Sequence, residues 1–388
     1  MTRAEIVDWA LRLYEDLDLA SVRSWLAAHS GRHACGYLPV YAPREVIRAA
    51  GMLPVGIHGG GDQIEIIRGD AYYQSYICHL PRSVIELAES GRLSALSAVL
   101  FPSTCDVIRN LSGMWKLMYP GVYVRYVDVP QLRDVAAAGA FWTTELRTLQ
   151  RELCRVGGRD PNDDDLCAAI SEYNVARRLV RTLYAARRED PERIPTEELY
   201  LLMRAGEVVP VDLFIARAQA YLAATEREPR RARDRIRVVV MGAFCEQPPL
   251  ALIKTIERAG CAIVDDDFLL GNRFLTADVA TAGDPAANLA ETFIRHAVAT
   301  SVLYEPNPAG KRQLVAQRVR EARADGIIFA SPSFCDPSLL DRQLLRAAAD
   351  VEGIPSIAFK YAENTGQLQP FREQAGTFAD SIKLWGGV

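Results

Sequence analysis

Two short stretches of the chain place a cysteine where an apolar strand gives way to a helix. Residues 326–343 read GIIFASPSFCDPSLLDRQ, with Cys335 at the turn, and residues 97–110 read SAVLFPSTCDVIRN, with Cys105 there. A helix N-terminus offers unpaired N–H groups and partial positive charge, which lower the pKa of a thiol. Pro337 fits the first helical turn, where its missing N–H costs nothing. Each turn therefore predicts a metal-binding thiolate, and two similar turns suggest one shared site.

Cysteine usage narrows the kind of site. The chain has 8 cysteines in 388 residues, irregularly spaced, which does not suit a disulfide scaffold, and the CxxC pairing of zinc sites is absent. Cys78 and Cys245 also precede predicted helices, so they join Cys105 and Cys335 as candidate ligands. The alternative is that four small residues simply occupy tight turns. The remaining cysteines are expected to be packing residues: Cys35 and Cys261 at strand starts, and Cys154 and Cys167 within helical patterns.

Composition excludes several classes of partner. The 45 basic and 49 acidic residues give a net charge of −4, and no basic block predicts a nucleic-acid or membrane surface. No apolar run reaches the roughly 18 residues that a membrane span needs, and the N-terminus carries acids where a signal peptide would be apolar. A cytoplasmic protein of two or more domains is expected from this length and composition.

The spacing of apolar residues predicts the strands and helices that position the cysteines. Strands are expected at 35–40, 53–57, 98–101, 122–127, 237–241, 262–264, 327–330 and 356–359, most of them followed by a helix. This alternation predicts an α/β fold with parallel sheets in both halves of the chain. The expected division is an N-terminal helical segment (1–30), a first α/β lobe (31–130), a helical bridge (131–230) and a second α/β lobe (231–388).

At this point the sequence resembles the 2-hydroxyacyl-CoA dehydratase and benzoyl-CoA reductase family, over nearly its whole length. The most specific matching segments are YAPREVI at 41–47, CEQPP at 245–249, VDDDF at 264–268 and SFCDP at 333–337. The tail, with AFKYAENTGQ at 358–367 and QAGTF at 374–378, resembles the reductase branch, closest to the C-type subunits of ATP-dependent (class I) benzoyl-CoA reductases.

The resemblance implies a cofactor and its ligands. It implies two Rossmann- or flavodoxin-like lobes with an iron–sulfur cluster of the [4Fe-4S] type in the cleft between them, held by Cys78, Cys105 and Cys335. Cys245 matches a position that is not a ligand across the family, and it is kept as a reserve ligand because of its turn. Three thiolates would leave one iron without a protein ligand, as at the open position of catalytic zinc sites.

The resemblance also implies an activity and its partners. The expected reaction, part of anaerobic aromatic degradation, dearomatises benzoyl-CoA to a cyclic dienoyl-CoA with electrons of very low potential. The sequence has no G-x-x-x-x-G-K-[ST] loop. ATP use is therefore expected in separate ATP-hydrolysing iron–sulfur activator subunits, with ferredoxin as the upstream donor. A homologous sister subunit would complete the pocket for the acyl-CoA substrate.

Weaker candidates accompany the cysteines. His79 could donate a hydrogen bond to a cluster sulfur or a proton to the ring, but it could equally cap its helix. Glu45 lies early in a helix, where the helix dipole favours a carboxylate regardless of function, yet the matching family stretch lies near the substrate. Asp265 to Asp267 resemble a divalent-metal site, although solvent-exposed acids at a strand end are the favoured interpretation.

Three alternative functions stay open. A subunit of a 2-hydroxyacyl-CoA dehydratase would use the electron catalytically without consuming it. A non-catalytic iron–sulfur electron carrier fits the lack of a nucleophile and base constellation. A plain α/β binding module with inert thiols would be colourless and free of iron.

Overall fold

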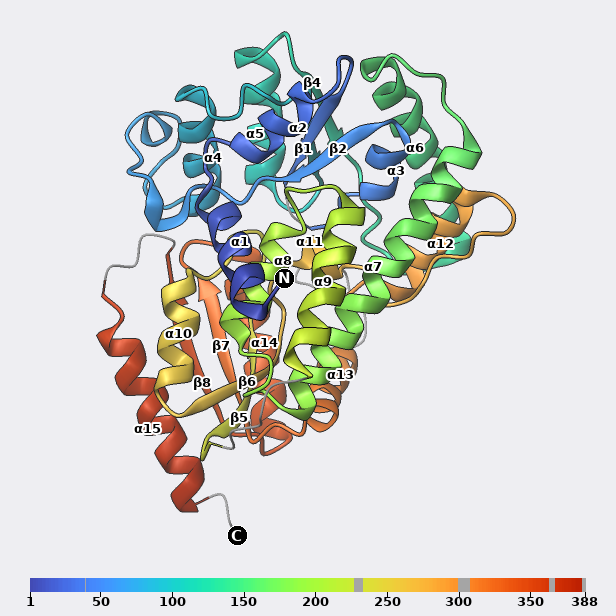
Figure 1. Cartoon of the computed structure of the whole chain (residues 1–388). Helices are drawn as coiled ribbons and strands as arrows, with labels where there is room; N and C mark the ends of the chain where they lie inside the picture. The colour runs from blue at the N-terminus through green and yellow to red at the C-terminus, as the bar shows by residue number, and fades with distance from the viewer. Residues whose placement is uncertain (39, 227–232, 299–307, 363–366, 386–388) are drawn as a thin grey trace.

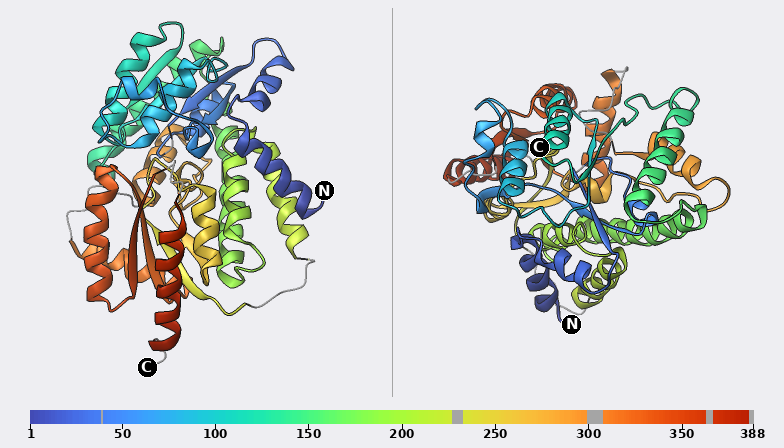
Figure 2. Two further views of the ribbon diagram at one scale, coloured as in Figure 1. Left: turned by 90° about the vertical axis from the view of Figure 1, so that its left-hand side faces the viewer. Right: turned by 90° about the horizontal axis from the view of Figure 1, so that it is seen from above.

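The computed structural model describes residues 1–38, 40–226, 233–298, 308–362 and 367–385. It contains two four-stranded parallel sheets, one from each half of the chain, with a column of helices beside them (Figures 1 and 2). The prediction of an α/β fold with two parallel sheets is confirmed. The predicted boundary at residues 230 and 231 lies outside the described residues, as do residues 363–366 of the tail motif.

The first sheet is built by residues 33–127. Its elements are β1 (His33–Tyr37), α3 (Arg44–Ala49), β2 (Met52–Gly56), α4 (His79–Glu89), β3 (Ala98–Pro102), α5 (Asp106–Met118) and β4 (Tyr123–Val127). The strand order is β2-β1-β3-β4, and every neighbouring pair is parallel. Inner strands of a parallel sheet are covered on both faces and read as continuous apolar runs. This explains why every residue of β3 is buried.

The second sheet is built by residues 236–361, and one more helix follows it. The elements are β5 (Ile236–Met241), α10 (Leu250–Arg258), β6 (Cys261–Asp266), α11 (Leu270–Arg273), α12 (Pro285–His296), α13 (Pro308–Ala322), β7 (Gly326–Pro332), α14 (Asp336–Val351), β8 (Ser356–Tyr361) and α15 (Gln369–Trp385). The strand order is β6-β5-β7-β8, again all parallel. Both sheets therefore arrange their strands in the order second, first, third, fourth.

This shared order determines where ligands can bind. It is the order of the flavodoxin-like sheets, in which a crevice opens beyond the carboxyl ends of the first and third strands. In the first sheet these strands are β1 and β3, and in the second they are β5 and β7. The loops that follow them are thus the expected site-forming loops of each lobe.

The helical column joins the two lobes. It comprises α6 (Val135–Val156), α7 (Asp163–Glu189), α8 (Thr196–Ala205) and α9 (Val211–Thr225), and α1 (Arg3–Glu15) and α2 (Ala20–Ala27) precede the first sheet. The long helix α7 runs alongside both lobes (Figure 1). Its residue Ile170 belongs to the apolar core of the first lobe, whereas Leu183 belongs to that of the second. Helix α1 docks on the column through Arg3, whose guanidinium lies 2.8 Å from the Glu198 carboxylate.

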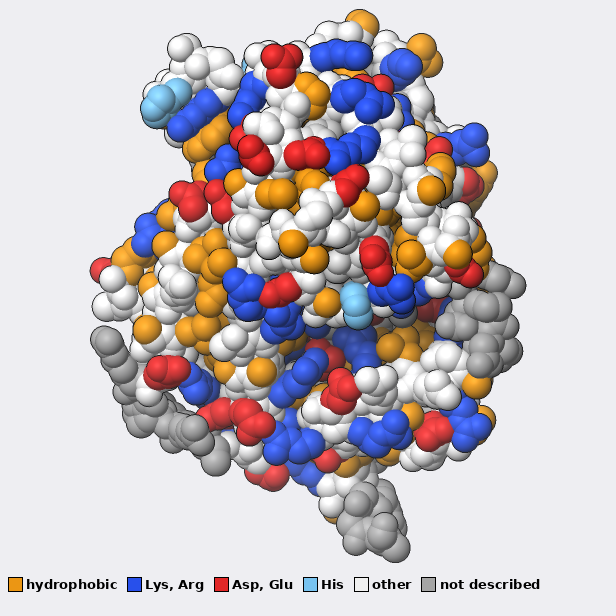
Figure 3. All heavy atoms as spheres, turned by 90° about the vertical axis from the view of Figure 1, so that its right-hand side faces the viewer, with side chains coloured by type: hydrophobic (Ala, Val, Ile, Leu, Met, Phe, Trp, Pro, Cys, Tyr) orange, Lys and Arg blue, Asp and Glu red, His pale blue; other side chains and the backbone are white. Residues whose placement is uncertain are grey.

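One segment of the second half crosses to the first lobe. Helix α12 follows β6 in sequence, yet it packs against α6, and its Phe293 ring contacts Trp142 at a tilt, with 5.4 Å between ring centroids. Arg147 ties the two regions on the surface, because it pairs with both Asp163 and Asp284. On this face of the molecule basic and acidic side chains are interleaved (Figure 3). The crossing segment was not foreseen from the sequence.

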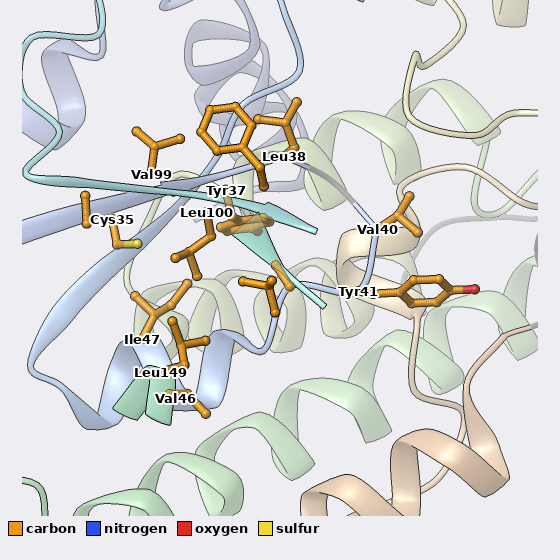
Figure 4. Packing of buried hydrophobic residues seen from close by; sticks show 14 of the residues in the cluster. Cys35, Tyr37, Leu38, Val40, Tyr41, Val46, Ile47, Val99, Leu100 and Leu149 are labelled. Carbon is orange, nitrogen blue, oxygen red and sulfur yellow. The ribbon is translucent and has the colours of Figure 1, made fainter. Parts of the chain in front are cut away.

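Cys35 lies inside the first core. Figure 4 shows it in the group of apolar side chains that includes Val99 and Ile47. Burial raises the pKa of the Cys35 thiol. Cys154 and Cys261 are also buried, which fits the prediction that these are packing cysteines. Among the described residues, no helix is both long and apolar enough to cross a membrane.

Candidate cofactor site between the two lobes

The turns that carry Cys105 and Cys335 have the same construction. Cys105 follows β3 and caps α5, and Cys335 follows β7 and caps α14. Each turn is attached to the neighbouring edge strand by a backbone hydrogen bond from the serine two residues before the cysteine. Ser103 N donates to Val127 O at 2.9 Å, and Ser333 N donates to Tyr361 O at 2.6 Å. The two turns that look similar in sequence therefore occupy equivalent places in the two lobes.

Phe334 makes the second turn possible. Its φ of 62° lies in the left-handed region, which is uncommon for an aromatic residue. This conformation reverses the backbone after β7 so that Cys335 can cap α14. The Phe334 side chain is 53% exposed as a result. Strained positions of this kind concentrate at functional sites.

Cys78 is contributed by a third helix start. It caps α4, which begins at His79, so the helix predicted after this cysteine is present. The preceding loop is anchored by Glu86, because one of its carboxylate oxygens accepts backbone N–H groups from Ile67, Arg68 and Gly69 at 2.6 to 3.0 Å. The three cysteines expected as ligands therefore share one position, the N-cap of a helix.

Cys245 lies in the loop after β5, five residues before α10 begins. Several side chains fix this loop: the Asp267 carboxylate accepts the N–H groups of Gly242 and Ala243 at 2.6 and 3.1 Å, and Ser338 Oγ donates to Gly242 O at 2.5 Å. The Cys245 thiol lies 3.8 Å from Thr104 Oγ1, next to Cys105. Cys245 therefore contacts the first lobe directly across the junction.

The four thiols share one environment. Cys245 and Cys335 are buried members of the first apolar core, and Cys78 and Cys105 pack against that core. A negative charge on Cys105, Cys335 or Cys78 would raise the pKa of the Cys245 thiol, and a charge on Cys105 would raise that of Cys335. Segments far apart in the sequence thus bring their sulfur atoms into mutual electrostatic range at the junction of the lobes.

Burial dominates the protonation of Cys105, Cys245 and Cys335. It raises the pKa of Cys335 to about 12, although the backbone N–H of Ser338 favours the thiolate. It also raises the pKa of Cys105, against the N–H groups of Val107 and Ile108, and raises that of Cys245. The expectation that the helix N-termini lower these pKa values is wrong for the chain alone, because loss of hydration outweighs the helix dipole. Metal binding would deprotonate a coordinating thiol outright.

The donor set fits an iron–sulfur cluster in its chemistry. None of the eight cysteines, all of which lie in the described residues, forms a disulfide, and helix N–H groups face the sulfur atoms of Cys105 and Cys335. Within the described part of the chain, no three His, Cys, Asp or Glu side chains gather closely enough to hold a single metal ion. Each thiolate of a four-iron cluster binds a different iron, so its ligands surround a larger object than one ion.

A cavity is lined by the sequence neighbours of two of these cysteines. Its volume is about 590 Å³, within the range of small-molecule sites. The first lobe contributes residues 62–66 and Asp70 of the loop together with His79 and Arg82, and the second lobe contributes Ser333, Phe334 and Ala362. His79 directly follows Cys78, and Phe334 directly precedes Cys335. The cavity wall is thus continuous with two of the candidate ligands.

The two weaker catalytic candidates lie in different surroundings. His79 is 7% exposed and lines the cavity. Glu45 is buried in α3 and forms an ion pair with Arg177 of α7, so it links the first lobe to the helical column. A catalytic role for either residue stays a prediction.

The acids at the end of β6 differ from expectation. Asp265 and Asp266 are 2% and 1% exposed, so the prediction of solvent-exposed acids is wrong for them. Arginines from three helices surround the pair: Arg187 and Arg188 of α7, Arg273 of α11 and Arg318 of α13. Burial alone would raise the pKa of Asp265, but Arg318 and Arg273 outweigh it and the pKa is lowered. These acids hold helices on the second sheet.

Sequence reasoning missed two contributors to the site. Thr104 contacts Cys245 across the lobes, and Tyr73 lies under the electrostatic influence of Cys78 and Cys105. The repeated Ser-x-Cys-Asp pattern could have identified the residue between serine and cysteine as part of the site. This residue is Thr104 in one turn and Phe334 in the other. No comparable pattern marks Tyr73.

Comparison with known proteins shows which family and which proteins the chain is similar to. The family model described as 2-hydroxyglutaryl-CoA dehydratase, D-component, matches residues 39–382. The C-type subunit of benzoyl-CoA reductase from Thauera aromatica is 51% identical over 385 residues, covering 99% of this chain and 100% of that protein. The beta subunit of lactoyl-CoA dehydratase from Anaerotignum propionicum is 26% identical over 356 residues (92% and 93%), and the beta subunit of (R)-2-hydroxyglutaryl-CoA dehydratase from Acidaminococcus fermentans is 26% identical over 368 residues (94% and 96%).

Proposed function

The chain belongs to the 2-hydroxyglutaryl-CoA dehydratase D-component family, and from that premise we propose that it is the C-type subunit of an ATP-dependent benzoyl-CoA reductase. One observation carries the choice between branches of the family. Identity to the reductase subunit is 51% over 99% of the chain, against 26% to the dehydratase subunits. The reaction proposed is the dearomatisation of benzoyl-CoA to a cyclic dienoyl-CoA.

The cofactor proposed is a [4Fe-4S] cluster held by Cys78, Cys105 and Cys335. The cluster would supply single electrons of low potential, set by the hydrogen bonds and burial around it. The three N-cap positions suit this task, since helix N–H groups and dipoles stabilise the negative charge of thiolates. Cys245 stays the reserve ligand, because its loop is fixed at the same junction. Negative charge on the other three cysteines would raise the pKa of its thiol.

The cavity is proposed as the side from which substrate reaches the site. Its apolar margin includes Phe334, 53% exposed, and the neighbouring Ile67 is 68% exposed. Exposed apolar side chains around a cavity are typical of surfaces that bind a partner protein. We therefore propose that a homologous sister subunit docks here and excludes water from the bound acyl-CoA. His79 and Arg82 would face the substrate from the first lobe.

The energy source is proposed to lie in other subunits. The chain has no phosphate-binding G-x-x-x-x-G-K-[ST] loop. ATP-hydrolysing iron–sulfur activator subunits would deliver the electrons, with ferredoxin as their donor. This leaves the present chain the tasks of holding its cofactor and shaping the substrate site.

Reconstitution separates the candidate functions. The chain is coexpressed with a sister subunit and an activator, purified without oxygen and supplied with ATP, reductant and benzoyl-CoA. Formation of a dienoyl-CoA supports the proposal. The dehydratase alternative, favoured by the description of the family model, predicts dehydration of a 2-hydroxyacyl-CoA without net reduction. Turnover of neither thioester, by a chain that nonetheless carries iron, would indicate an electron carrier.

A further inference from the structure

The hydroxyl group of Tyr73 is buried and has no hydrogen-bond partner among the described residues. A buried donor without an acceptor destabilises the folded state. Buried polar groups of folded proteins are almost always paired, so an exception requires an explanation such as a bound group. A bound group that offers an acceptor to the Tyr73 hydroxyl would provide that explanation.

The position of Tyr73 limits the answer. The residue belongs to the loop between β2 and α4, and its ring packs against the core of the first lobe. Burial is the main cause that raises the pKa of its hydroxyl, and a negative charge on Cys78 or Cys105 would raise it further. The loop is held in place by Glu86 and by Arg82, whose guanidinium lies 2.9 Å from Asp70. The hydroxyl is therefore buried in the loop that leads to Cys78, and Tyr73, Cys78 and Cys105 all pack against the same core.

Resting on the cofactor of the proposed function, we propose that Tyr73 donates a hydrogen bond to a sulfur atom of the iron–sulfur cluster at Cys78 and Cys105. Sulfides and thiolates are the acceptors that such a cluster would place where Tyr73 has none. Tyr73 would then be a positioning and tuning residue, acting on the reduction potential without touching substrate.

The protonation of Tyr73 suits this role. Burial, followed by the charges of Cys78 and Cys105, raises the pKa of the Tyr73 hydroxyl. The group thus stays a neutral donor at physiological pH. Hydrogen bonds to cluster sulfurs help to set the reduction potential. Because the reduced cluster carries one more negative charge, a donor stabilises it more than the oxidised cluster. Tyr73 therefore makes the cluster easier to reduce.

The test compares Tyr73→Phe with Tyr76→Phe, a control on the same loop whose side chain is 64% exposed. The full chain is loaded with iron and sulfide without oxygen, and its reduction is followed by electron paramagnetic resonance. We expect Tyr73→Phe to keep its iron and to disfavour reduction about tenfold, a fall of about 59 mV for a one-electron couple. Tyr76→Phe should leave the potential unchanged.

A second measurement uses the iron-free chain. There the Tyr73 hydroxyl has no partner, so Tyr73→Phe should not lower the melting temperature. A lowered melting temperature would reveal a structural partner and overturn the inference. An unchanged potential in Tyr73→Phe with full iron would overturn it as well, leaving the proposed function intact. A wild-type chain that takes up no iron would overturn both.

Discussion

Cys105 and Cys335 occupy equivalent positions in the two lobes. Each follows the third strand of its sheet and caps the helix after it. Because both sheets have the strand order of flavodoxin-like folds, both cysteines border the crevice at the carboxyl ends of the strands. Cys335 of the second lobe is buried in the apolar core of the first lobe, and Cys105 packs against that same core. The site is thus built from one motif used twice, completed by Cys78.

The loop that carries Cys245 depends on a glycine. Gly242 has a φ of +115°, and an added Cβ would lie 2.8 Å from the carbonyl oxygen of Ala330. Gly242→Ala should therefore lower the free energy of unfolding by about 2 kcal/mol or more. Chemical denaturation of the iron-free chain measures this loss. Gly353→Ala is the control: its φ is +67° with open space around it, so only about 1 kcal/mol is expected. Equal losses would contradict the steric explanation.

The first lobe and the helical column are joined by a buried ion pair. Arg177→Gln leaves the carboxylate of Glu45 buried without its partner, which should cost about 3–5 kcal/mol of unfolding free energy. The control is the neighbouring variant Arg178→Gln, which removes an exposed ion pair with Asp278. It should lower the free energy of unfolding by less than about 1 kcal/mol. Adding Glu45→Gln to Arg177→Gln should recover part of the loss. A double variant no more stable than Arg177→Gln would argue against this pairing.

Stability should depend on the protonation of Asp267. Burial raises the pKa of this carboxyl to about 7 in the folded chain, from an ordinary value of 3.8. Since the folded state holds the proton more tightly, stability is greatest below about pH 4 as far as this group is concerned. It is lost as pH rises through 7, by at most about 4 kcal/mol. Urea denaturation between pH 5 and 8 should show this slope in the wild type and a flatter profile in Asp267→Asn. Parallel profiles would exclude Asp267 as the source.

The repeat of strands and cysteine turns could be predicted from the sequence. Parallel strands are continuous apolar runs, and Ser-x-Cys-Asp before a helical pattern marks a turn at the end of a strand. The identity of tertiary partners could not. The apolar face of α12 indicates that it is buried, but only the fold shows that α6 buries it.

The charges and thiols illustrate the same limit. Asp265 looks exposed from sequence because an isolated carboxylate avoids the interior. It is buried because Arg188 and Arg318, distant along the chain, surround it together with the nearby Arg273. The thiol pKa values also depend on burial between two lobes, which local sequence does not reveal. The helix N-termini were predictable, and the desolvation that outweighs them was not.

The central claim is that three helix-capping thiols hold one cofactor between the lobes. Its most direct test is the iron content of the full chain, purified without oxygen, in alanine variants of Cys78, Cys105 and Cys335, with Cys154→Ala as a buried control. We predict about four iron per chain in the wild type and in Cys154→Ala, and loss of iron in each of the other three. Equal iron in all four variants would contradict the claim.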